Sequence, residues 1–221
     1  MTETGAPGAS VECIFSDASL LVLHKPAGLL CVPGRGPNKQ DCLSARAQQQ
    51  WPGALIVHRL DQATSGLVLM ARTPAMQRRL SQAFAERQMH KRYQAVVQGR
   101  MAPPPDGAWG EIDLPIAADW ERRPLRVVDA VLGKPSLTRW RMLEHDQASD
   151  TTRVELEPVT GRTHQLRVHL AALGHPILGD ALYADATTQA RAPRLLLHAL
   201  HLAFTHPDSS QWLEFALPAP F

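Results

Sequence analysis

Cysteine is scarce in this chain: Cys13, Cys31 and Cys42 are the only three among 221 residues, and no pair of them has Cys-x-x-Cys spacing. An odd number without that spacing argues against a disulfide scaffold and against a structural zinc site, and it fits a reducing compartment. The sequence also lacks any apolar run near the roughly 18 residues that cross a bilayer. Its N-terminus lacks the basic and apolar regions of an export signal. We therefore expect a cytoplasmic protein that does not enter membranes.

The sequence also has no large excess of positive or negative charge, since its formal net charge is only +2. The arginines are nevertheless concentrated in two tracts, and guanidinium groups suit bidentate phosphate contacts and stacking on bases. Ordinary solvated faces are the alternative for both tracts. The first tract comprises Arg72, Arg78, Arg79, Arg87, Lys91 and Arg92, and the second comprises Arg122, Arg123 and Arg126 beside Trp120.

The length and the 44% apolar content allow a sizeable core, either as one domain or as two joined lobes. Residues 1–10 are small, aperiodic and include glycine and proline, so we expect a disordered leader there and a single domain over 11–221. The proline-rich loop over 101–107 is the candidate boundary between lobes.

Apolar spacing and turn residues predict a mixture of strands and helices. A helix that begins at Pro74 has Thr73 as its N-cap. A second helix over 163–173 has Thr163 as its cap and Gly174 at its C-terminal end. The other predictions are a hairpin over 11–23, a short helix over 41–50, and strands over 92–98, 111–114, 125–131, 137–143, 152–157, 195–202 and 212–215.

The most informative segment is HRLDQATSGL at residues 58–67. Apolar runs of strand type flank it and a Thr-Ser-Gly step follows the aspartate, so Asp61 is expected at the rim of a core where a strand breaks into a turn. A carboxylate held there can stay ionised and still face a ligand, as a nucleophilic aspartate requires. The alternative is an aspartate that only bonds its own backbone in the turn. A kinase-like interpretation fails because Leu60 interrupts the His-Arg-Asp order.

A second cluster, GRTHQLRVH, follows at residues 161–169. Arg162 stands just before the predicted helix, where a guanidinium could hold the Asp61 carboxylate by two parallel hydrogen bonds. Desolvation in a cleft would raise the pKa of Asp61, whereas Arg162 would lower it. The alternative is an arginine that only anchors the start of the helix.

The histidines do not predict a metal site. His164 and His169 are five residues apart, which does not align them on one helix face. His198 and His201 could share a face only in a helix, and their segment is predicted to be a strand. Because no carboxylate or cysteine completes either pair at ligand spacing, we expect no bound metal.

Three segments in order, HRLDQATSGL, KRYQAVVQG and TGRTHQLRVHLAALGHPILGDALY, resemble the signature segments of the RluA-type pseudouridine synthases. The segments LHKPAGLLCVPG and LLLHA are similar to this family too. The resemblance runs from about Val11 onward. It is specific because several long motifs occur in the right order, whereas any one of them alone would be weak.

The resemblance implies that uridine in RNA is isomerised to pseudouridine on a flipped-out nucleotide, without metal or organic cofactor. It identifies Asp61 with the family's catalytic aspartate, Tyr93 with its active-site tyrosine, and Arg162 with the arginine paired with that aspartate. Arg59 corresponds to an arginine that takes the flipped nucleotide's place in the stack, and Leu166 to a residue lining the uracil pocket. A plain core aromatic is the alternative for Tyr93.

Further RNA contacts are expected around these residues. The segment over 119–126 resembles the loop that closes over RNA in a member of the family, so Trp120 and its neighbouring guanidiniums would stack on bases. A partly buried loop anchor is the alternative for Trp120. The expected substrate-binding set is His58, Arg59, Thr64, Leu166, Trp120, Arg122, Arg123 and Arg126.

The implied fold is α+β: a central, mostly antiparallel mixed sheet in two lobes, flanked by helices, with the catalytic cleft between the lobes. The implied partner is RNA, namely 23S ribosomal RNA, a tRNA anticodon stem-loop or both, and we expect a monomer. An S4-type RNA-binding domain is not expected, because only residues 1–10 precede the catalytic domain.

Two other functions remain as alternatives. A non-catalytic RNA-binding protein could share the fold, although the joint presence of Asp61, Tyr93 and Arg162 argues against it. A metal-free hydrolase could use an Asp–Arg pair, but glycoside hydrolysis normally needs two carboxylates and Asp61 has no partner motif. The target uridine, the number of RNAs modified and the order of bond making stay open.

Overall fold

The computed structural model describes residues 10–105 and 108–221, which divide into two compact units. Unit 1 comprises the chain up to Lys91 together with Ala199–Pro220, and unit 2 comprises Arg92–His198 with Phe221. The boundary predicted at 101–107 is wrong, because the chain passes between the units within two strands, β5 (His90–Gln98) and β11 (Leu197–Thr205). Strand residues carry no turn signal that could mark such a passage. The predicted leader lies, apart from Ser10, outside the described residues.

Unit 1 is built on a sheet in which β4 is buried along its whole length. The strands β1 and β2 form the predicted hairpin, and Asp17 closes its turn by accepting hydrogen bonds from the backbone N–H groups of Ser19 and Leu20. The sheet order in this unit is β1-β2-β4-β11, with β3 also paired to β4 and β12 paired to β11. The bounds are β1 Glu12–Ser16, β2 Leu20–Lys25, β3 Leu55–Ile56, β4 Ser65–Ala71 and β12 Trp212–Ala216.

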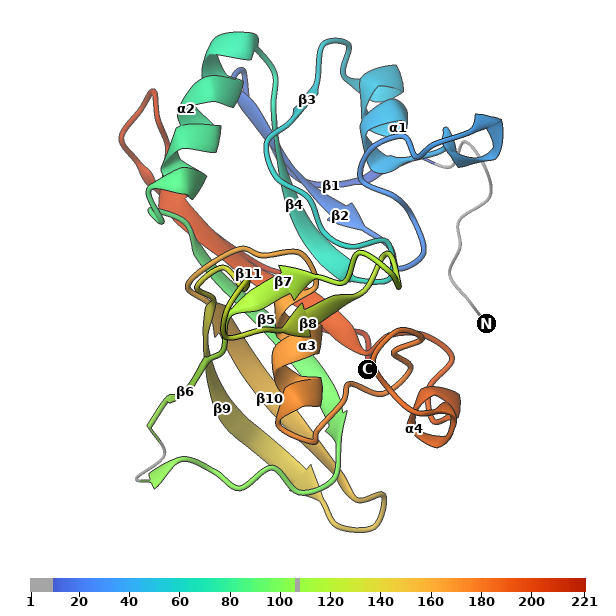
Figure 1. The fold of residues 1–221 in the computed structure, drawn as a ribbon. Helices are drawn as coiled ribbons and strands as arrows, with labels where there is room; N and C mark the ends of the chain where they lie inside the picture. Colours follow the sequence, from blue (N-terminus) through green and yellow to red (C-terminus); the bar gives the residue numbers. More distant parts are fainter. Residues whose placement is uncertain (1–9, 106–107) are drawn as a thin grey trace. The chain divides into compact units, whose positions relative to one another are not determined.

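The helix α2 (Pro74–Ala85) covers this sheet by packing against β3 and β4 (Figure 1). It begins as predicted, with the Thr73 hydroxyl accepting a hydrogen bond from the N–H of Met76 at 3.2 Å. Met76 and Leu80 are buried in a core that includes Phe204 of β11. The other helices of the unit are the 3-10 turn η1 (Pro37–Lys39) and α1 (Leu43–Gln50).

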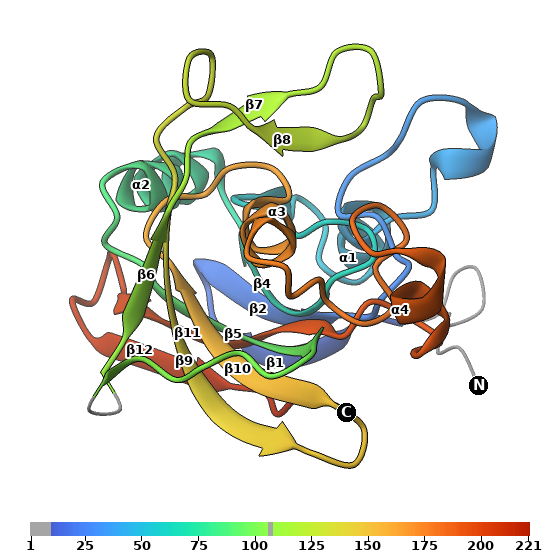
Figure 2. The ribbon, with the colours of Figure 1, turned by 60° about the horizontal axis from the view of Figure 1, so that its bottom comes forward.

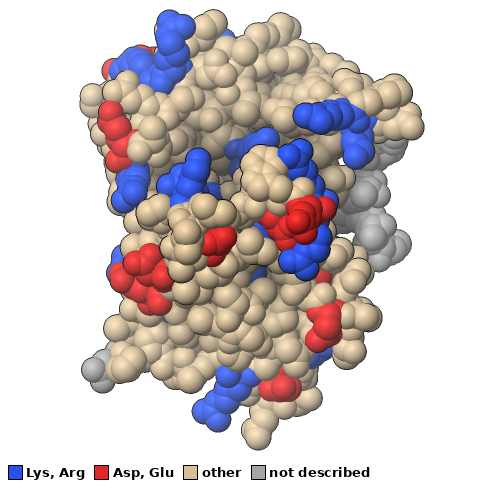
Figure 3. Space-filling view, viewed as in Figure 1, with Lys and Arg blue, Asp and Glu red and all other residues tan. Residues whose placement is uncertain are grey.

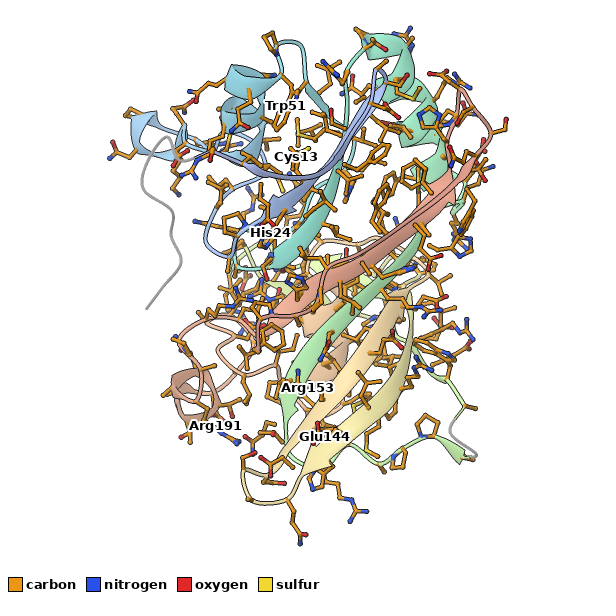
Figure 4. The ribbon with its side chains drawn as sticks, turned by 180° about the vertical axis from the view of Figure 1, so that it is seen from behind. Cys13, His24, Trp51, Glu144, Arg153 and Arg191 are labelled. Carbon is orange, nitrogen blue, oxygen red and sulfur yellow. The ribbon has the colours of Figure 1, made fainter. Side chains whose placement is uncertain are left out.

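Unit 2 has an antiparallel sheet in the order β5-β10-β9-β6. Figure 4 views it from the face that carries Arg153 of β10 and Glu144 of β9, which are cross-strand partners. A separate two-stranded hairpin joins β7 and β8. The bounds are β6 Gly110–Asp113, β7 Ile116–Ala118, β8 Arg126–Val128, β9 Leu137–Asp146 and β10 Thr151–Pro158.

In this hairpin one predicted strand is too long and one strand was missed. The strand predicted over 125–131 stops early because the Asp129 carboxylate accepts hydrogen bonds from the N–H groups of Val131 and Leu132, which turns the chain. The strand β7 has only three residues, too few for an alternating pattern, and was not predicted.

The helix α3 (Gln165–Ala172) contacts β9 and β10 of the sheet as well as β8, which runs beside it in Figure 2. The prediction that Thr163 caps it is wrong: the N-cap is His164, in the left-handed conformation with φ 58°. The predicted end is confirmed, since Gly174 has φ +82° just after the helix. The short helix α4 (Ala186–Ala190) was not predicted. Within the described residues, no helix has both the length and the apolar character to cross a membrane.

Candidate active site

Asp61 lies in the loop over 57–64 between β3 and β4, here called the Asp61 loop, and is half-buried. The preceding residue, Leu60, is buried, and both its N–H and its carbonyl are hydrogen-bonded to Cys31. Its N–H donates to the Cys31 sulfur at 3.2 Å, and its carbonyl accepts from that thiol at 3.4 Å. Burial raises the pKa of the Cys31 thiol, so the thiol stays protonated and keeps its hydrogen to donate. The backbone before the carboxylate is therefore fixed.

The backbone after Asp61 is held by Lys25, a fully buried lysine at the end of β2. Its Nζ donates to the carbonyl oxygens of Pro26, Leu29 and Gln62 at 2.8, 2.8 and 3.1 Å. Gly28 adds a backbone hydrogen bond to the Gln62 carbonyl at 2.8 Å. This anchoring role was missed in the sequence, where the only signal was a lysine at the end of an apolar strand.

Thr64 and Gly66 explain why the Thr-Ser-Gly step follows the aspartate. Thr64 is buried, and its N–H donates to the Asp61 carbonyl at 3.1 Å, which closes the turn. Gly66 has φ +121°, and a Cβ on it would meet the carbonyl oxygen of Ala199 at 2.4 Å. Only glycine lets β11 approach β4 so closely.

His58 packs inside unit 1. Its Nε2 accepts a hydrogen bond from the N–H of Leu69 at 2.9 Å, and its ring stacks on Phe84 with centroids 4.5 Å apart. Burial, with a smaller contribution from Lys91, lowers the pKa of His58 from 6.5 to about 3. The imidazole is therefore neutral and carries its hydrogen on Nδ1. These contacts give His58 a role in packing, and its expected contact with substrate stays a prediction.

Arg59, by contrast, is exposed, and no hydrogen bond or ion pair of its guanidinium is found among the described residues. A cavity of about 210 Å³ lies beside the Asp61 loop within unit 1. Of its charged side chains, Arg46 is neutralised by two hydrogen bonds to Asp41, both 2.7 Å long, which leaves Lys39 as an exposed cation. The lining comprises Pro26, Ala27, Gly28, Leu29, Leu30, Asn38, Lys39, Asp41, Arg46 and Gln62.

Tyr93 belongs to unit 2, where it lies on β5 opposite Leu156 of β10 and is half-buried. The strand becomes fully buried a few residues later, at Ala95 and Val97. Tyr93 is therefore placed at the partly exposed start of a core strand, where an aromatic ring is packed while part of it stays accessible.

Arg162 also belongs to unit 2 and lies in the loop over 159–164 between β10 and α3, here called the Arg162 loop. Its side chain is exposed and donates from Nε to the Pro135 carbonyl at 3.3 Å. The buried Gln165 shapes the loop, because its Oε1 accepts from the N–H of Arg162 at 3.0 Å and from the Thr160 hydroxyl at 2.7 Å. The next residue of α3, Leu166, is buried.

Trp120 protrudes from the loop over 119–125 between β7 and β8, here called the hairpin loop. It is 71% exposed, so the alternative of a partly buried anchor is wrong. The guanidinium of Arg123 lies 4.3 Å from its ring centroid. Arg122 forms an ion pair with Asp119 at 2.7 Å, and basic and acidic side chains lie side by side over this loop in Figure 3. Arg126 begins β8 at the base of the loop.

The histidines have hydrogen-bond partners rather than the surroundings of metal ligands. His169 bonds Thr138 and the Leu114 carbonyl, both at 2.9 Å, and His201 pairs with Glu214 at 2.8 Å. In the described ranges, no three His, Cys, Asp or Glu side chains converge as a metal ion would require.

The predicted residues thus fall into two groups. Asp61, His58, Arg59 and Thr64 lie in unit 1, whereas Tyr93, Arg162, Leu166 and the hairpin loop with Arg126 lie in unit 2. The pairing of Asp61 with Arg162 that the sequence suggested stays a prediction. Each group has the chemistry expected of it: unit 1 supplies a carboxylate on a rigid loop, and unit 2 supplies a phenol, guanidiniums and an exposed indole.

Comparison with known proteins gives a consistent result. A family model described as RNA pseudouridylate synthase matches residues 19–172. The chain is 47% identical over 208 residues to the dual-specificity RNA pseudouridine synthase RluA of Escherichia coli K12, covering 94% of this chain and 93% of that protein. The protein of the same name from Pasteurella multocida is 43% identical over 211 residues, covering 96% of this chain and 94% of that protein.

Solved structures agree with these relatives. The human RNA pseudouridylate synthase domain containing 1 superposes with a TM-score of 0.79 at 30% identity, over 97% of this chain and 85% of that chain. The human RNA pseudouridylate synthase domain containing 4 superposes with a TM-score of 0.73 at 26% identity, over 95% of this chain and 88% of that chain. The similarity therefore extends through both units of the chain.

Proposed function

Because the chain belongs to the RNA pseudouridylate synthase family, we propose that Asp61, Tyr93 and Arg162 together carry out the isomerisation of uridine to pseudouridine in RNA. The observation that carries the proposal is the 47% identity to a named synthase over 94% of the chain. The class of enzyme, an RNA-modifying isomerase, follows from the family. The roles of the individual residues are the proposal.

The reaction breaks the bond between uracil N1 and ribose C1′, turns the base, and joins C5 to C1′. The proton on C5 is lost and N1 gains a proton, so the product is an isomer of the substrate. Asp61 either attacks C1′ or assists formation of a glycal intermediate. In both routes the carboxylate must hold a fixed position against the sugar. The ties of Cys31 to Leu60 and of Lys25 to Gln62 support this role, because they immobilise the peptides on either side of Asp61.

Tyr93 serves as the general base that removes a proton from C5 or from the ribose. A free tyrosine has a pKa of about 10, so neighbouring groups must help it to act near neutral pH. Arg162 keeps Asp61 ionised, since a guanidinium that donates two hydrogen bonds to a carboxylate favours its charged form.

The uridine must leave its stack before this chemistry, at a cost of a few kcal/mol. Arg59 fills the space that the base vacates, and its exposed guanidinium supports this role. Leu166 lines the uracil pocket. Trp120 and Arg123 stack on exposed bases next to the target, and their exposure and mutual stacking support that use.

The substrates are 23S ribosomal RNA, a tRNA anticodon stem-loop or both, and the enzyme works as a monomer in the cytoplasm. Activity on both kinds of RNA is supported by the names of the relatives from Escherichia coli and Pasteurella multocida, which are dual-specificity synthases.

The test uses tRNA anticodon stem-loops and 23S fragments transcribed with uridine tritiated at C5, because pseudouridine formation releases that tritium. Asp61→Asn should release none, while its RNA affinity stays within about threefold of that of the unaltered enzyme. Asp150→Asn, in the exposed turn between β9 and β10, is the matched control and should retain full release. Turnover by Asp61→Asn would exclude the proposed role of the carboxylate. Binding without release by the unaltered enzyme would point to a non-catalytic RNA-binding protein.

A further inference from the structure

The side chain of Tyr183, in the turn between α3 and α4, is held by a buried ion pair. Arg167 of α3 donates from Nε and Nη2 to the two carboxylate oxygens of Asp180 at 2.8 and 2.6 Å, and both side chains are almost fully buried. Asp180 also accepts hydrogen bonds from the N–H groups of Leu182 and Tyr183. The guanidinium of Arg167 lies 5.1 Å from the Tyr183 ring centroid. The position of the phenol is therefore well determined within unit 2.

The hydroxyl of Tyr183 joins two segments that are far apart in the sequence. It accepts a hydrogen bond from the backbone N–H of Arg126, the first residue of β8 and the base of the hairpin loop, at 3.0 Å. It also lies 2.6 Å from Nδ1 of His164, the N-cap of α3. One phenol oxygen thus contacts both the hairpin that carries Trp120 and the loop that carries Arg162.

His164 is the residue at which this contact matters. Its φ of 58° puts a residue with a Cβ in the left-handed region, which is sparsely populated by such residues and needs support from its surroundings. The hydroxyl of Tyr183 supplies that support from one side. Gln165 holds the other side of the loop, because its Oε1 accepts a hydrogen bond from the N–H of Arg162. Arg162 is thereby set between two fixed points.

We propose that Tyr183 is a positioning residue whose hydroxyl holds the Arg162 loop and the base of the hairpin loop in one fixed arrangement. The inference rests on the proposed function, which gives Arg162 a role in catalysis and the hairpin loop a role in binding RNA. Tyr183 does not touch the reacting atoms in this proposal. It keeps the guanidinium of Arg162 in the position that its proposed role toward Asp61 requires.

The decisive variant is Tyr183→Phe, which removes the hydroxyl and keeps the ring against Arg167. We expect kcat at saturating RNA to fall by about tenfold or more, while the affinity for RNA changes by less than about threefold. The matched control is Thr152→Val in β10. It also removes a buried hydroxyl of unit 2, one that is hydrogen-bonded to Gly99, Met101 and His145, and it should leave kcat unchanged.

A measurement independent of activity accompanies the kinetics. Hydrogen exchange of the peptides over 119–128 and 160–168 should become faster in Tyr183→Phe and not in Thr152→Val, because only the first variant releases both segments. A double-mutant cycle combines Tyr183→Phe with His164→Ala. We expect the kcat of the double variant to lie within about twofold of the kcat of the slower single variant, because both changes remove the same contact.

Each outcome decides the proposal. If hydrogen exchange is unchanged in Tyr183→Phe, the claim that Tyr183 holds the two segments together is wrong. If exchange is faster but kcat is unaltered, the claim that Tyr183 positions Arg162 is wrong. Additive losses in the double-mutant cycle overturn the link through His164. If the unaltered enzyme releases no tritium, the proposed function fails instead, and the exchange measurement still decides whether Tyr183 joins the two segments.

Discussion

At the scale of single residues, Lys25 shows how a charge can be used inside a core. An ammonium group is costly to bury unless its hydrogens are all paired, and here three carbonyl oxygens receive them. Two of these carbonyls belong to the turn that follows β2, and the third belongs to Gln62, next to Asp61. The lysine therefore links the structure of the core to the position of the carboxylate.

Replacing this lysine tests that link. Lys25→Met keeps the length and apolar character of the side chain and leaves the three carbonyl oxygens without their donor. We expect the free energy of unfolding to fall by about 2–4 kcal/mol in urea titrations, with turnover also reduced. Lys39→Met, at an exposed position of η1, should change stability by less than about 0.5 kcal/mol. Equal stability of the two variants would contradict the anchoring role.

His58 predicts a dependence of stability on pH. Its pKa of about 3 in the folded protein lies below its ordinary value of 6.5, so the unfolded chain binds a proton that the folded protein does not. Stability from this residue is complete above pH 6.5 and is lost as the pH falls toward 3. Between about pH 6 and pH 4 the free energy of unfolding should fall by an extra ~1.4 kcal/mol per pH unit relative to His58→Gln. Parallel curves for the two proteins would disprove the burial of a neutral imidazole.

At the scale of elements, the hairpin β7–β8 is a small structure that presents polar and aromatic side chains. It has three residues in each strand, and its loop is closed by backbone hydrogen bonds from Asp119 to Leu125 and from Leu125 to Arg122. Trp120 contributes little to any core, because most of its surface is exposed. An indole kept in water on a braced loop is suited to contact with a partner.

The charges of this loop should appear in the salt dependence of RNA binding. Arg122→Ala combined with Arg123→Ala should weaken binding and reduce the slope of log K against log salt by about one to two, because each phosphate contact releases about one counterion. Arg100→Ala combined with Arg191→Ala removes the same charge from other exposed positions of unit 2 and is the control. A slope that does not change in the first pair would mean that these arginines do not meet phosphate.

The elements themselves were largely predictable. The hairpin over 11–23, the cap of α2 at Thr73 and the closing strands are confirmed, because each depends on local turn chemistry or on an apolar period. One failure has a cause that apolar spacing does not show. The start of α3 is set by the contact of His164 with Tyr183 and by the reach of Gln165 to Thr160, and neither is visible in the spacing of apolar residues.

At the scale of the whole molecule, the family resemblance and the α+β fold class predicted from the motifs are confirmed. The sequence patterns also placed Asp61 in the turn before a strand, Tyr93 within a strand and Arg162 just before a helix, and the structure has them there. What they could not give was the division of the chain, because unit 1 takes β11 and β12 from the far end of the sequence. Pairing between distant strands leaves no local signal in either strand.

This composition of unit 1 predicts the effect of truncation. A chain that ends at Leu196 lacks β11 and β12, so β4 keeps β2 and β3 but loses its neighbour β11, and the core loses Phe204. We expect amides of β4 to lose their protection from hydrogen exchange in that chain. A chain that ends at Leu217 keeps both strands and should retain the protection. Equal protection in the two chains would show that unit 1 does not need its late strands.

The late arrival of β11 also has a consequence during translation. While the ribosome is still producing unit 2, β4 has an open edge, and Gly66 has not met Ala199. The segment bearing Asp61 is thus synthesised early but acquires its finished surroundings only when nearly the whole polypeptide has emerged.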